Sequence, residues 1–329
     1  MHYSDYLQLD KILNAQQPES DRLGMHAHDE MLFIVIHQTY ELWFHQLLYE
    51  TGSVAAIFGQ PALNDNSPEL QTIVHRLSRC ATILKVLVQQ IDIMETMNPM
   101  DFQDFRDLLR PASGFQSVAF KLLEARLGLR YEHRFGQRYY LSQLRQEEVE
   151  RILAAEREPS LLQLVNAWLE RMPFFDEAAA DRFWADYRSR YAGSLAEGEK
   201  GNLNGFDQVF QGVETGDRSL SAAACRSALF IMLYRGYPLL QLPFQVLHQL
   251  LEIDEQLSTW RYRHMSMVNR TIGTRVGTGG STGKDYLSSA LERHHLFREI
   301  AALTSFLLQR KRLPELSPEM QRRLGFAGG

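Results

Sequence analysis

One histidine stands among aromatic residues in a segment with strong helical periodicity. At 100° per residue, one apolar stripe of a helix expected over 30–49 contains Phe33, His37, Tyr40, Phe44 and Leu48. A neutral imidazole in such a stripe can offer one donor and one acceptor to a flat ligand with polar edges. The same pattern suits a core histidine bonded to a backbone carbonyl, so this helix alone leaves both interpretations open.

A second histidine, His264, lies in the middle of another apolar stripe, which contains Leu257, Trp260, Val268 and Ile272. No metal-binding side chain stands next to it. Such a histidine is either a core residue or the single axial ligand of a haem, whose porphyrin supplies the other four ligands. The spacing by itself does not separate these two interpretations.

A short helix closed by Pro111 places an arginine on its inward stripe, together with Phe102, Phe105 and Leu109. A guanidinium there must meet a carboxylate, supplied either by the protein or by a ligand. A structural ion pair is common in proteins. The neighbouring acidic residues of the segment point elsewhere on the helix, which favours the ligand for Arg106.

A glycine-rich segment, GTRVGTGGSTGK at 273–284, comes after the helix that carries the second histidine. Its glycines permit positive φ and a concave array of N–H groups that suits an anion. It is not a P-loop, because Thr278 stands where that motif needs glycine and Asp285 comes directly after Lys284. We expect either a loop that holds a carboxylate or ammonium group, partly through the Thr278 hydroxyl, or a surface loop.

Helical periodicity dominates the chain, and no alternating run is long enough for a sheet, which predicts an all-α fold. In the 30–49 helix, Asp29 is the expected N-cap, and helical structure is expected to stop at Gly52 or Gly59. A second apolar stripe there contains Leu32, Val35, Ile36, Trp43 and Leu47. Further helices are expected at about 68–96, 99–110, 114–127, 146–155, 159–171, 178–191, 219–235, 242–270, 284–310 and 317–323.

Two segments without clear periodicity, 130–145 and the linker-like 192–205, flank a group of expected helices. We therefore predict one domain over 1–329, with a helical insertion at about 130–220.

The composition favours a soluble protein of the cytoplasm. The chain has 329 residues with a net charge of -5, and its charges are interspersed, which disfavours a nucleic-acid partner. Only Cys80 and Cys225 are present, too few for a disulfide framework. The amino terminus lacks the basic region and apolar run of a signal peptide, and Arg235 breaks the longest apolar stretch. We expect neither secretion nor a membrane partner.

Three blocks in this order resemble the tryptophan 2,3-dioxygenase family: HDEMLFIVIHQTYELWF at 28–44, DFQDFRDLLRPASGFQS at 101–117 and WRYRHMSMVNRTIGTRVGTGGSTG at 260–283. The segment YSDYLQLD at 3–10 is also similar, and only 130–220 matches loosely. The resemblance implies a helical-bundle haem protein that cleaves the indole C2–C3 bond of L-tryptophan with O₂. The product would be N-formyl-L-kynurenine, in the first step of tryptophan degradation by the kynurenine pathway.

The resemblance also implies a site. His264 would be the axial ligand of haem b, one per subunit and ferrous in the active form. His37 would accept a hydrogen bond from the indole N–H while Phe33 packs against the ring. Arg106 would pair with the substrate carboxylate, and Thr278 would contact the ammonium and carboxylate end.

The remaining implied contacts come from three short stretches. Ser113 and Gly114 match residues near bound O₂, and Phe102 stands where some members carry tyrosine and others phenylalanine. An amino-terminal segment would cover the substrate of a neighbouring subunit, which implies a homotetramer. The further substrate-binding positions are Ile34, Val35, Ile36, Tyr3, Tyr6 and Leu7.

Two other functions remain open from the sequence. A related haem monooxygenase would use the same pocket to insert one oxygen atom into a tryptophan derivative. A helical binding or scaffold protein would have kept the fold and lost the chemistry, although the intact His264 argues against that.

Overall fold

The structure, a computed structural model, describes residues 1–61, 63, 67–130, 141–172, 177–211, 218–273, 275 and 295–325. Within these ranges all regular structure is helical, which confirms the all-α prediction. In the same ranges, none of the helices combines the length and the apolar character that crossing a membrane requires.

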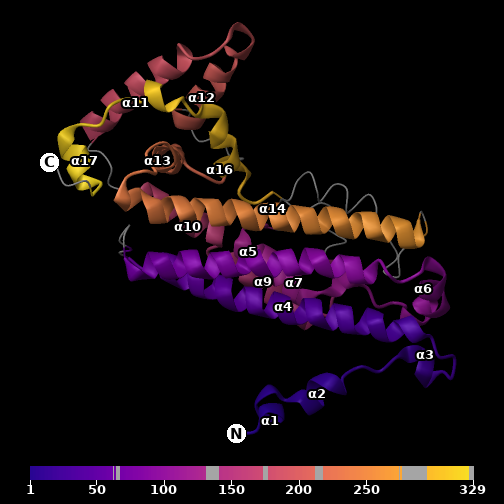
Figure 1. Cartoon of the computed structure of the whole chain (residues 1–329). Helices are drawn as coiled ribbons and strands as arrows, with labels where there is room; N and C mark the ends of the chain where they lie inside the picture. The colour runs from indigo at the N-terminus through magenta and orange to yellow at the C-terminus, as the bar shows by residue number, and fades with distance from the viewer. Residues whose placement is uncertain are drawn as a thin grey trace.

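Three long helices form the body of the molecule: α4 (His28–Phe58), α5 (Pro68–Met94) and α14 (Pro238–Ile272). They lie side by side, with α5 packed against both of the others (Figure 1). Proline at the start of α5 and of α14 suits the first helical turn, where an N–H group has no partner within the helix. The chain enters α5 through Ser67, whose hydroxyl accepts a hydrogen bond from the Leu70 N–H.

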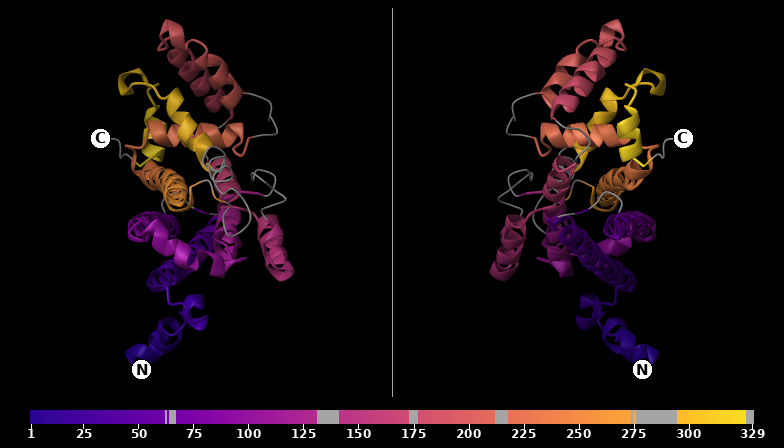
Figure 2. Two further views of the ribbon diagram at one scale, coloured as in Figure 1. Left: turned by 90° about the vertical axis from the view of Figure 1, so that its right-hand side faces the viewer. Right: turned by 90° about the vertical axis from the view of Figure 1, so that its left-hand side faces the viewer.

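Shorter helices cover two sides of this body. α7 (Val118–Leu127) packs on α4, α9 (Gln146–Arg157) packs on α7, and α10 (Leu161–Glu170) contacts α4, α7 and α13. The end of the molecule that contains the carboxyl terminus is built from α11 (Glu177–Ala192), α12 (Asn202–Phe210), α13 (Ala222–Leu233), α16 (Arg298–Ala302) and α17 (Pro318–Arg323) (Figure 2).

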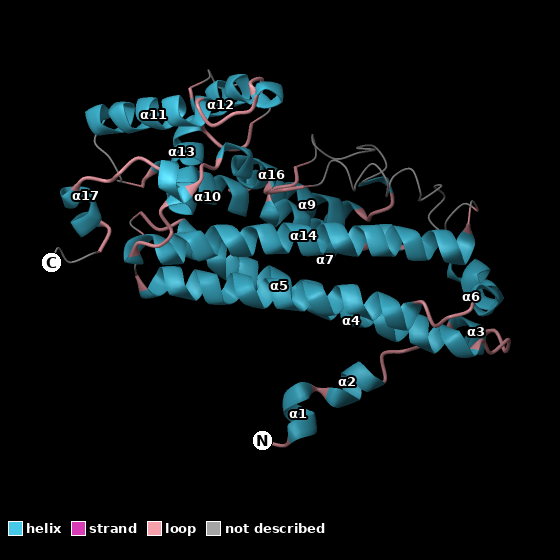
Figure 3. Ribbon diagram, turned by 45° about the horizontal axis from the view of Figure 1, so that its top comes forward, coloured by secondary structure: helices cyan, strands magenta, loops and turns pink. Residues whose placement is uncertain are grey.

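The amino-terminal arm leaves the body beside α4 (Figure 3). It contains α1 (Tyr3–Leu7) and α2 (Leu9–Leu13), neither of which has a buried residue. It returns to α4 where the Gln16 and Gln38 side chains bond to each other at 2.6 Å. The buried Glu30 carboxylate then accepts the N–H groups of Glu19 and Ser20, at 2.8 and 2.9 Å, and so fixes the start of α3 (Glu19–Arg22).

One continuous apolar cluster joins the long helices to the region around the expected insertion. Trp168 and Trp184 belong to the same cluster as Leu47 and Leu84 of α4 and α5. Helices α9 and α10 pack directly on α7, within the expected span of 130–220. The division into one domain with an insertion stays a prediction.

Several expected boundaries differ from the structure for local reasons. The N-cap of α4 is Ala27, and Asp29 is instead an acidic residue of its first turn. Gly52 lies inside α4, which continues because its neighbouring turns are buried against α5. α6 (Pro99–Arg106) ends before a 3₁₀ turn at Asp107–Leu109, and a second such turn at Gly114–Gln116 precedes α7.

Two further expectations need correction. The linker-like 192–205 contains a 3₁₀ turn at Glu197–Glu199 and the start of α12. Of the helix expected over 284–310, the part up to 294 lies outside the described residues, and the rest consists of α16 and the 3₁₀ turns Leu303–Phe306 and Arg310–Arg312.

Candidate ligand cavity and its two histidines

A cavity of about 620 Å³ opens between α4, the 3₁₀ turns that come after α6, and α7. This volume falls within the range of small-molecule sites. The α4 residues that line the cavity are spaced three or four positions apart, because residues at this spacing share one face of a helix. The residues lining the cavity are Phe33, His37, Glu41, His45, Leu48, Phe102, Leu109, Ala112, Ser113, Gly114, Gln116, Ser117, Val118, Ala119, Leu122 and Arg151.

The hydrogen bond of His37 defines which of its nitrogens can accept. Nδ1 lies 2.7 Å from the Phe33 carbonyl oxygen, which can only accept, so Nδ1 must carry the proton. Burial lowers the pKa of His37 below its ordinary value, opposed only partly by this bond. The ring is therefore neutral near pH 7, and its Nε2 is a hydrogen-bond acceptor on a residue that lines the cavity.

Aromatic rings surround this acceptor. The Phe33 ring lies 4.1 Å from His37 and 5.8 Å from Phe102, measured between centroids. Phe102 in turn packs edge-on against the fully buried Phe105. A flat apolar ligand with one N–H group would match this lining, because the rings supply dispersion contact and His37 supplies the acceptor.

Arg106 is the last residue of α6 and is only 4% exposed. The Asn98 side chain caps α6 by accepting a bond from the Met100 N–H at 2.9 Å, and Pro99 occupies the first turn. Its neighbour Phe105 belongs to a small apolar cluster with Ile36, Met94 and Met97. Arg106 is therefore a buried cation at the end of a helix whose Phe102 lines the cavity.

His264 lies on α14, with its ring stacked on Trp260. Burial lowers the pKa of its imidazole to about 4, and the nearby His37 contributes to this lowering. Its Nδ1 atom is buried and makes no hydrogen bond to any part of the chain that the structure describes. A neutral imidazole is suited to binding a metal ion through its unprotonated ring nitrogen.

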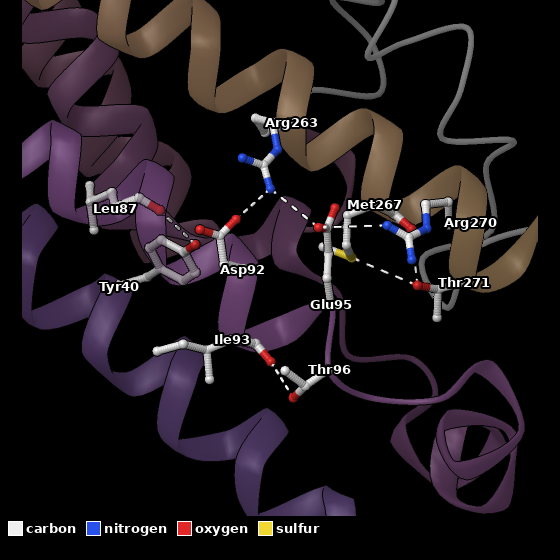
Figure 4. A network of polar contacts seen from close by, with 10 residues as sticks. All are labelled: Tyr40, Leu87, Asp92, Ile93, Glu95, Thr96, Arg263, Met267, Arg270 and Thr271. Atoms are coloured by element: carbon white, nitrogen blue, oxygen red, sulfur yellow. Dashed lines mark hydrogen bonds and ion pairs between the residues drawn. The ribbon is translucent and has the colours of Figure 1, made fainter.

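Charged residues fasten this part of α14 to α5. The Arg263 guanidinium contacts Asp92 at 2.6 Å and Glu95 at 3.2 Å, and Arg270 lies 3.6 Å from the same Glu95 (Figure 4). These contacts bracket His264 on both sides along the helix, so its backbone position relative to α5 is well determined.

Ligand-free protein is expected to lose stability as the pH falls. The unfolded chain takes up a proton at an ordinary histidine pKa of 6.5, whereas folded His264 has a pKa of about 4, so the unfolded state binds more protons between these values. From pH 7.5 to pH 5.0 this group should cost about 2 kcal/mol of unfolding free energy. Urea unfolding at both pH values should show that His264→Gln loses about 2 kcal/mol less than wild type. Equal losses in the two proteins would contradict the low pKa.

The structure brings some of the predicted site residues together and leaves others apart. Phe33, His37, Phe102, Ser113 and Gly114 line the one cavity, whereas Arg106 and His264 are not part of its described walls. Ile36 is buried in the small apolar cluster, Ile34 is half-buried, and Val35 is 42% exposed, so the second stripe of α4 is not uniformly buried. Tyr3, Tyr6 and Leu7 are exposed on the arm. Thr278 lies outside the described residues.

Three polar residues of the cavity were not predicted from the sequence. Glu41 and His45 continue the His37 face at intervals of four, so helical spacing could have found them. Arg151 comes from α9, and its position in the chain gave no such signal. The buried ion pair of Glu124 with Arg261, 2.8 Å long between α7 and α14, was also missed.

The fold and the cavity together define a helical-bundle protein with a ligand site lined by the neutral His37, which also contributes to the low pKa of His264. A family model described as tryptophan 2,3-dioxygenase matches residues 1–204 and 205–307. The tryptophan 2,3-dioxygenase of Alteromonas mediterranea is 42% identical over 354 residues, covering 99% of this chain and 97% of the relative. The one from Bdellovibrio bacteriovorus is 39% identical, covering 99% and 98%. The one from Xenopus laevis is 41% identical, covering 97% and 85%. The chain belongs to the tryptophan 2,3-dioxygenase family.

Proposed function

We propose that this chain is an enzyme that opens the indole ring of L-tryptophan with O₂ and forms N-formyl-L-kynurenine. The C2–C3 bond breaks, each of these carbons gains one oxygen atom as a carbonyl, and no further reductant is consumed. This is the first step of tryptophan degradation by the kynurenine pathway. The observation that carries the proposal is the aromatic cavity lined by Phe33, Phe102 and His37, in which Nδ1 of His37 donates to the Phe33 carbonyl oxygen and Nε2 can therefore accept an indole N–H.

Haem b is the cofactor that we assign, one per subunit and ferrous in the active form, with His264 as its axial ligand. The residues fit this group. Burial keeps the His264 ring neutral, so protonation does not compete with iron for the unprotonated ring nitrogen, and the other nitrogen, Nδ1, is buried with no hydrogen bond among the described residues. When bound, haem supplies O₂ binding and the redox chemistry.

The side chains of the chain then hold the substrate. Nε2 of His37 accepts the indole N–H, because Nδ1 already donates to the Phe33 carbonyl. Phe33 and Phe102 pack against the indole ring. Arg106 pairs with the carboxylate, and Thr278 contacts the ammonium and carboxylate end. Water is excluded and the indole is held in one orientation, which are the main contributions of a protein to cofactor chemistry.

Other proposed contacts surround these side chains. Ser113 begins a capping box at the 3₁₀ turn that contains Gly114, and both line the cavity where O₂ would be held. Ile34, Val35 and Ile36 connect Phe33 to His37 along α4 and complete the proposed substrate-binding stretch.

The decisive experiment traces both atoms of O₂. Reconstituted ferrous protein is mixed with tryptophan under anaerobic conditions and then exposed to ¹⁸O₂. We expect formylkynurenine absorbance and a product mass that contains two labels. A product with one label would instead identify a monooxygenase. A protein that gains no Soret band on reconstitution would be a helical binding protein without this chemistry.

We propose a homotetramer, in which the exposed amino-terminal arm would contact a neighbouring subunit. Tyr3 and Tyr6 are 72% and 69% exposed, an unusual state for two aromatic residues on one short helix unless another surface covers them. In the proposal, Tyr3, Tyr6 and Leu7 cover the substrate of a neighbouring subunit.

Replacing both tyrosines is expected to raise the KM for tryptophan about 10-fold, since two partly buried aromatic contacts of about 0.5–1.5 kcal/mol each are lost. Tyr3→Ser/Tyr6→Ser protein would be assayed by steady-state kinetics and sized by light scattering. Tyr49→Ser, at a tyrosine that is 73% exposed on α4, is the control. If the Tyr3→Ser/Tyr6→Ser protein is monomeric and still has the wild-type KM for tryptophan, the proposed role of the arm is contradicted.

We place the protein in the cytoplasm. Both cysteines are free and buried, and burial raises the pKa of Cys80 to about 12 and of Cys225 to about 11. Thiols of this kind behave as small apolar core residues, which suits a reducing compartment.

A further inference from the structure

The ring of His264 lies nearly parallel to the indole of Trp260, one helical turn earlier on α14. The two ring planes are only 8° apart, and their centroids are 5.3 Å apart. These values describe an offset parallel stack, which is one of the two preferred arrangements of aromatic pairs. The stack therefore restricts the rotation of the His264 imidazole about its Cβ–Cγ bond.

The plane of Trp260 is itself fixed by rings from other helices. Tyr40 and Phe44 of α4 meet it edge-on, at 6.0 and 6.2 Å, and Phe120 of α7 lies 5.1 Å away. The Tyr40 hydroxyl donates to the Leu87 carbonyl of α5 at 3.0 Å, so this ring is also anchored (Figure 4). The orientation of Trp260 is thus set by rings of α4 and α7, and α5 anchors one of these rings.

A metal-binding histidine is normally oriented by a hydrogen bond from its second ring nitrogen to a carboxylate or carbonyl group. In the described parts of the chain, the buried Nδ1 of His264 has no such bond. Arg263, the preceding residue, is engaged with Asp92 and Glu95 on α5. Among these residues, the contact that defines the plane of the imidazole is the stack on Trp260.

We propose that Trp260 is a positioning residue for His264. The indole face of Trp260 sets the plane of the imidazole that binds iron. This inference rests on the proposed haem site and adds to it the contact that orients the His264 imidazole toward iron. Tyr40 lies one turn after His37 on α4. Its contact with Trp260 therefore joins α4, which carries the substrate-facing His37, to α14, which carries the iron-binding His264.

The test measures the iron–histidine bond directly. Trp260→Leu and Trp260→Phe are reconstituted with haem, reduced, and examined by resonance Raman spectroscopy of the Fe(II)–His stretch. We expect a shifted and broadened band in Trp260→Leu, and a band close to that of wild type in Trp260→Phe, which keeps a ring face. Transfer of haem to apomyoglobin should be about 2- to 12-fold faster in Trp260→Leu.

A second buried tryptophan provides the matched control. Trp168 on α10 is 1% exposed, and its ring centroid lies 5.4 Å from that of Phe58. Trp168→Leu should lower the urea midpoint of the protein at least as much as Trp260→Leu, yet leave the Fe–His band unchanged.

Two results would overturn the inference while leaving the proposed function intact. One is a Trp260→Leu band with wild-type position and width, and the other is an equal change in Trp168→Leu, which would reveal a general loss of packing. Failure of the wild-type protein to bind haem would overturn the proposed function as well, so the two failures are distinguishable.

Discussion

His264→Ala protein is expected to purify without a Soret band and to turn over tryptophan about 1000-fold more slowly or worse, which corresponds to about 4 kcal/mol of lost barrier reduction. The physical reason is that one imidazole is the only protein bond to iron in the proposed site, so its loss removes both the attachment and the electronic tuning of the metal. Absorption spectra after reconstitution and steady-state kinetics measure the two consequences separately.

A surface histidine serves as the control for this change. His75 is exposed on α5 and contacts Arg79, so His75→Ala should keep haem and activity. Added imidazole should restore part of the Soret band to His264→Ala by occupying the vacated space. Full haem content and turnover in His264→Ala would show that iron is bound elsewhere.

The second large effect concerns the carboxylate of the substrate. Arg106→Met is expected to raise the KM for tryptophan about 10- to 150-fold, because a charge-assisted pair is worth about 1.5–3 kcal/mol. Arg106→Lys should recover only part of this affinity, since an ammonium group lacks the planar fork that matches a carboxylate. Steady-state kinetics should place the loss mainly in KM, because ground state and transition state share this contact.

A substrate analogue separates this role from a general loss of packing, which is needed because Arg106 is buried. Tryptamine lacks the carboxylate, so it should bind about equally weakly to wild type and to Arg106→Met. Arg110, exposed and paired with Asp107 at 3.3 Å, provides the control variant Arg110→Ala, which should bind tryptophan normally. An Arg106→Met protein that weakens tryptamine and tryptophan by the same factor would contradict the proposed pair.

Helical spacing was enough to predict the class of fold and to place His37 and His264 on apolar helical stripes, because apolar periodicity reports which face of a helix is covered. The position of His264 between Trp260 and Val268 is of this kind. The pattern could not reveal that the two rings stack, since side-chain planes depend on the neighbouring helices. Nor could the pattern show that Val35, an apolar residue on the same expected stripe as the buried Ile36, is 42% exposed.

Contacts between distant parts of the chain explain most of what the sequence left out. Arg151 reaches the cavity from α9, and Glu124 meets Arg261 across 137 positions. Glu30 looks like an ordinary acidic residue of a first turn, yet it is buried and accepts two backbone N–H groups from the arm. No local pattern encodes such pairs, because each depends on which helices pack together.

The uninterrupted course of α14 restricts how the chain can change in length. Asp254 accepts the N–H groups of Leu296 and Phe297, at 2.9 and 3.1 Å, and His264 lies ten positions later on the same rod, about 15 Å along the axis. One residue inserted between Asp254 and His264 would rotate the His264 imidazole by about 100° around the helix axis relative to Asp254, away from the side that it now faces. Deletions and insertions in this stretch should therefore be tolerated only in near-whole turns, whereas substitutions on its solvent side remain free.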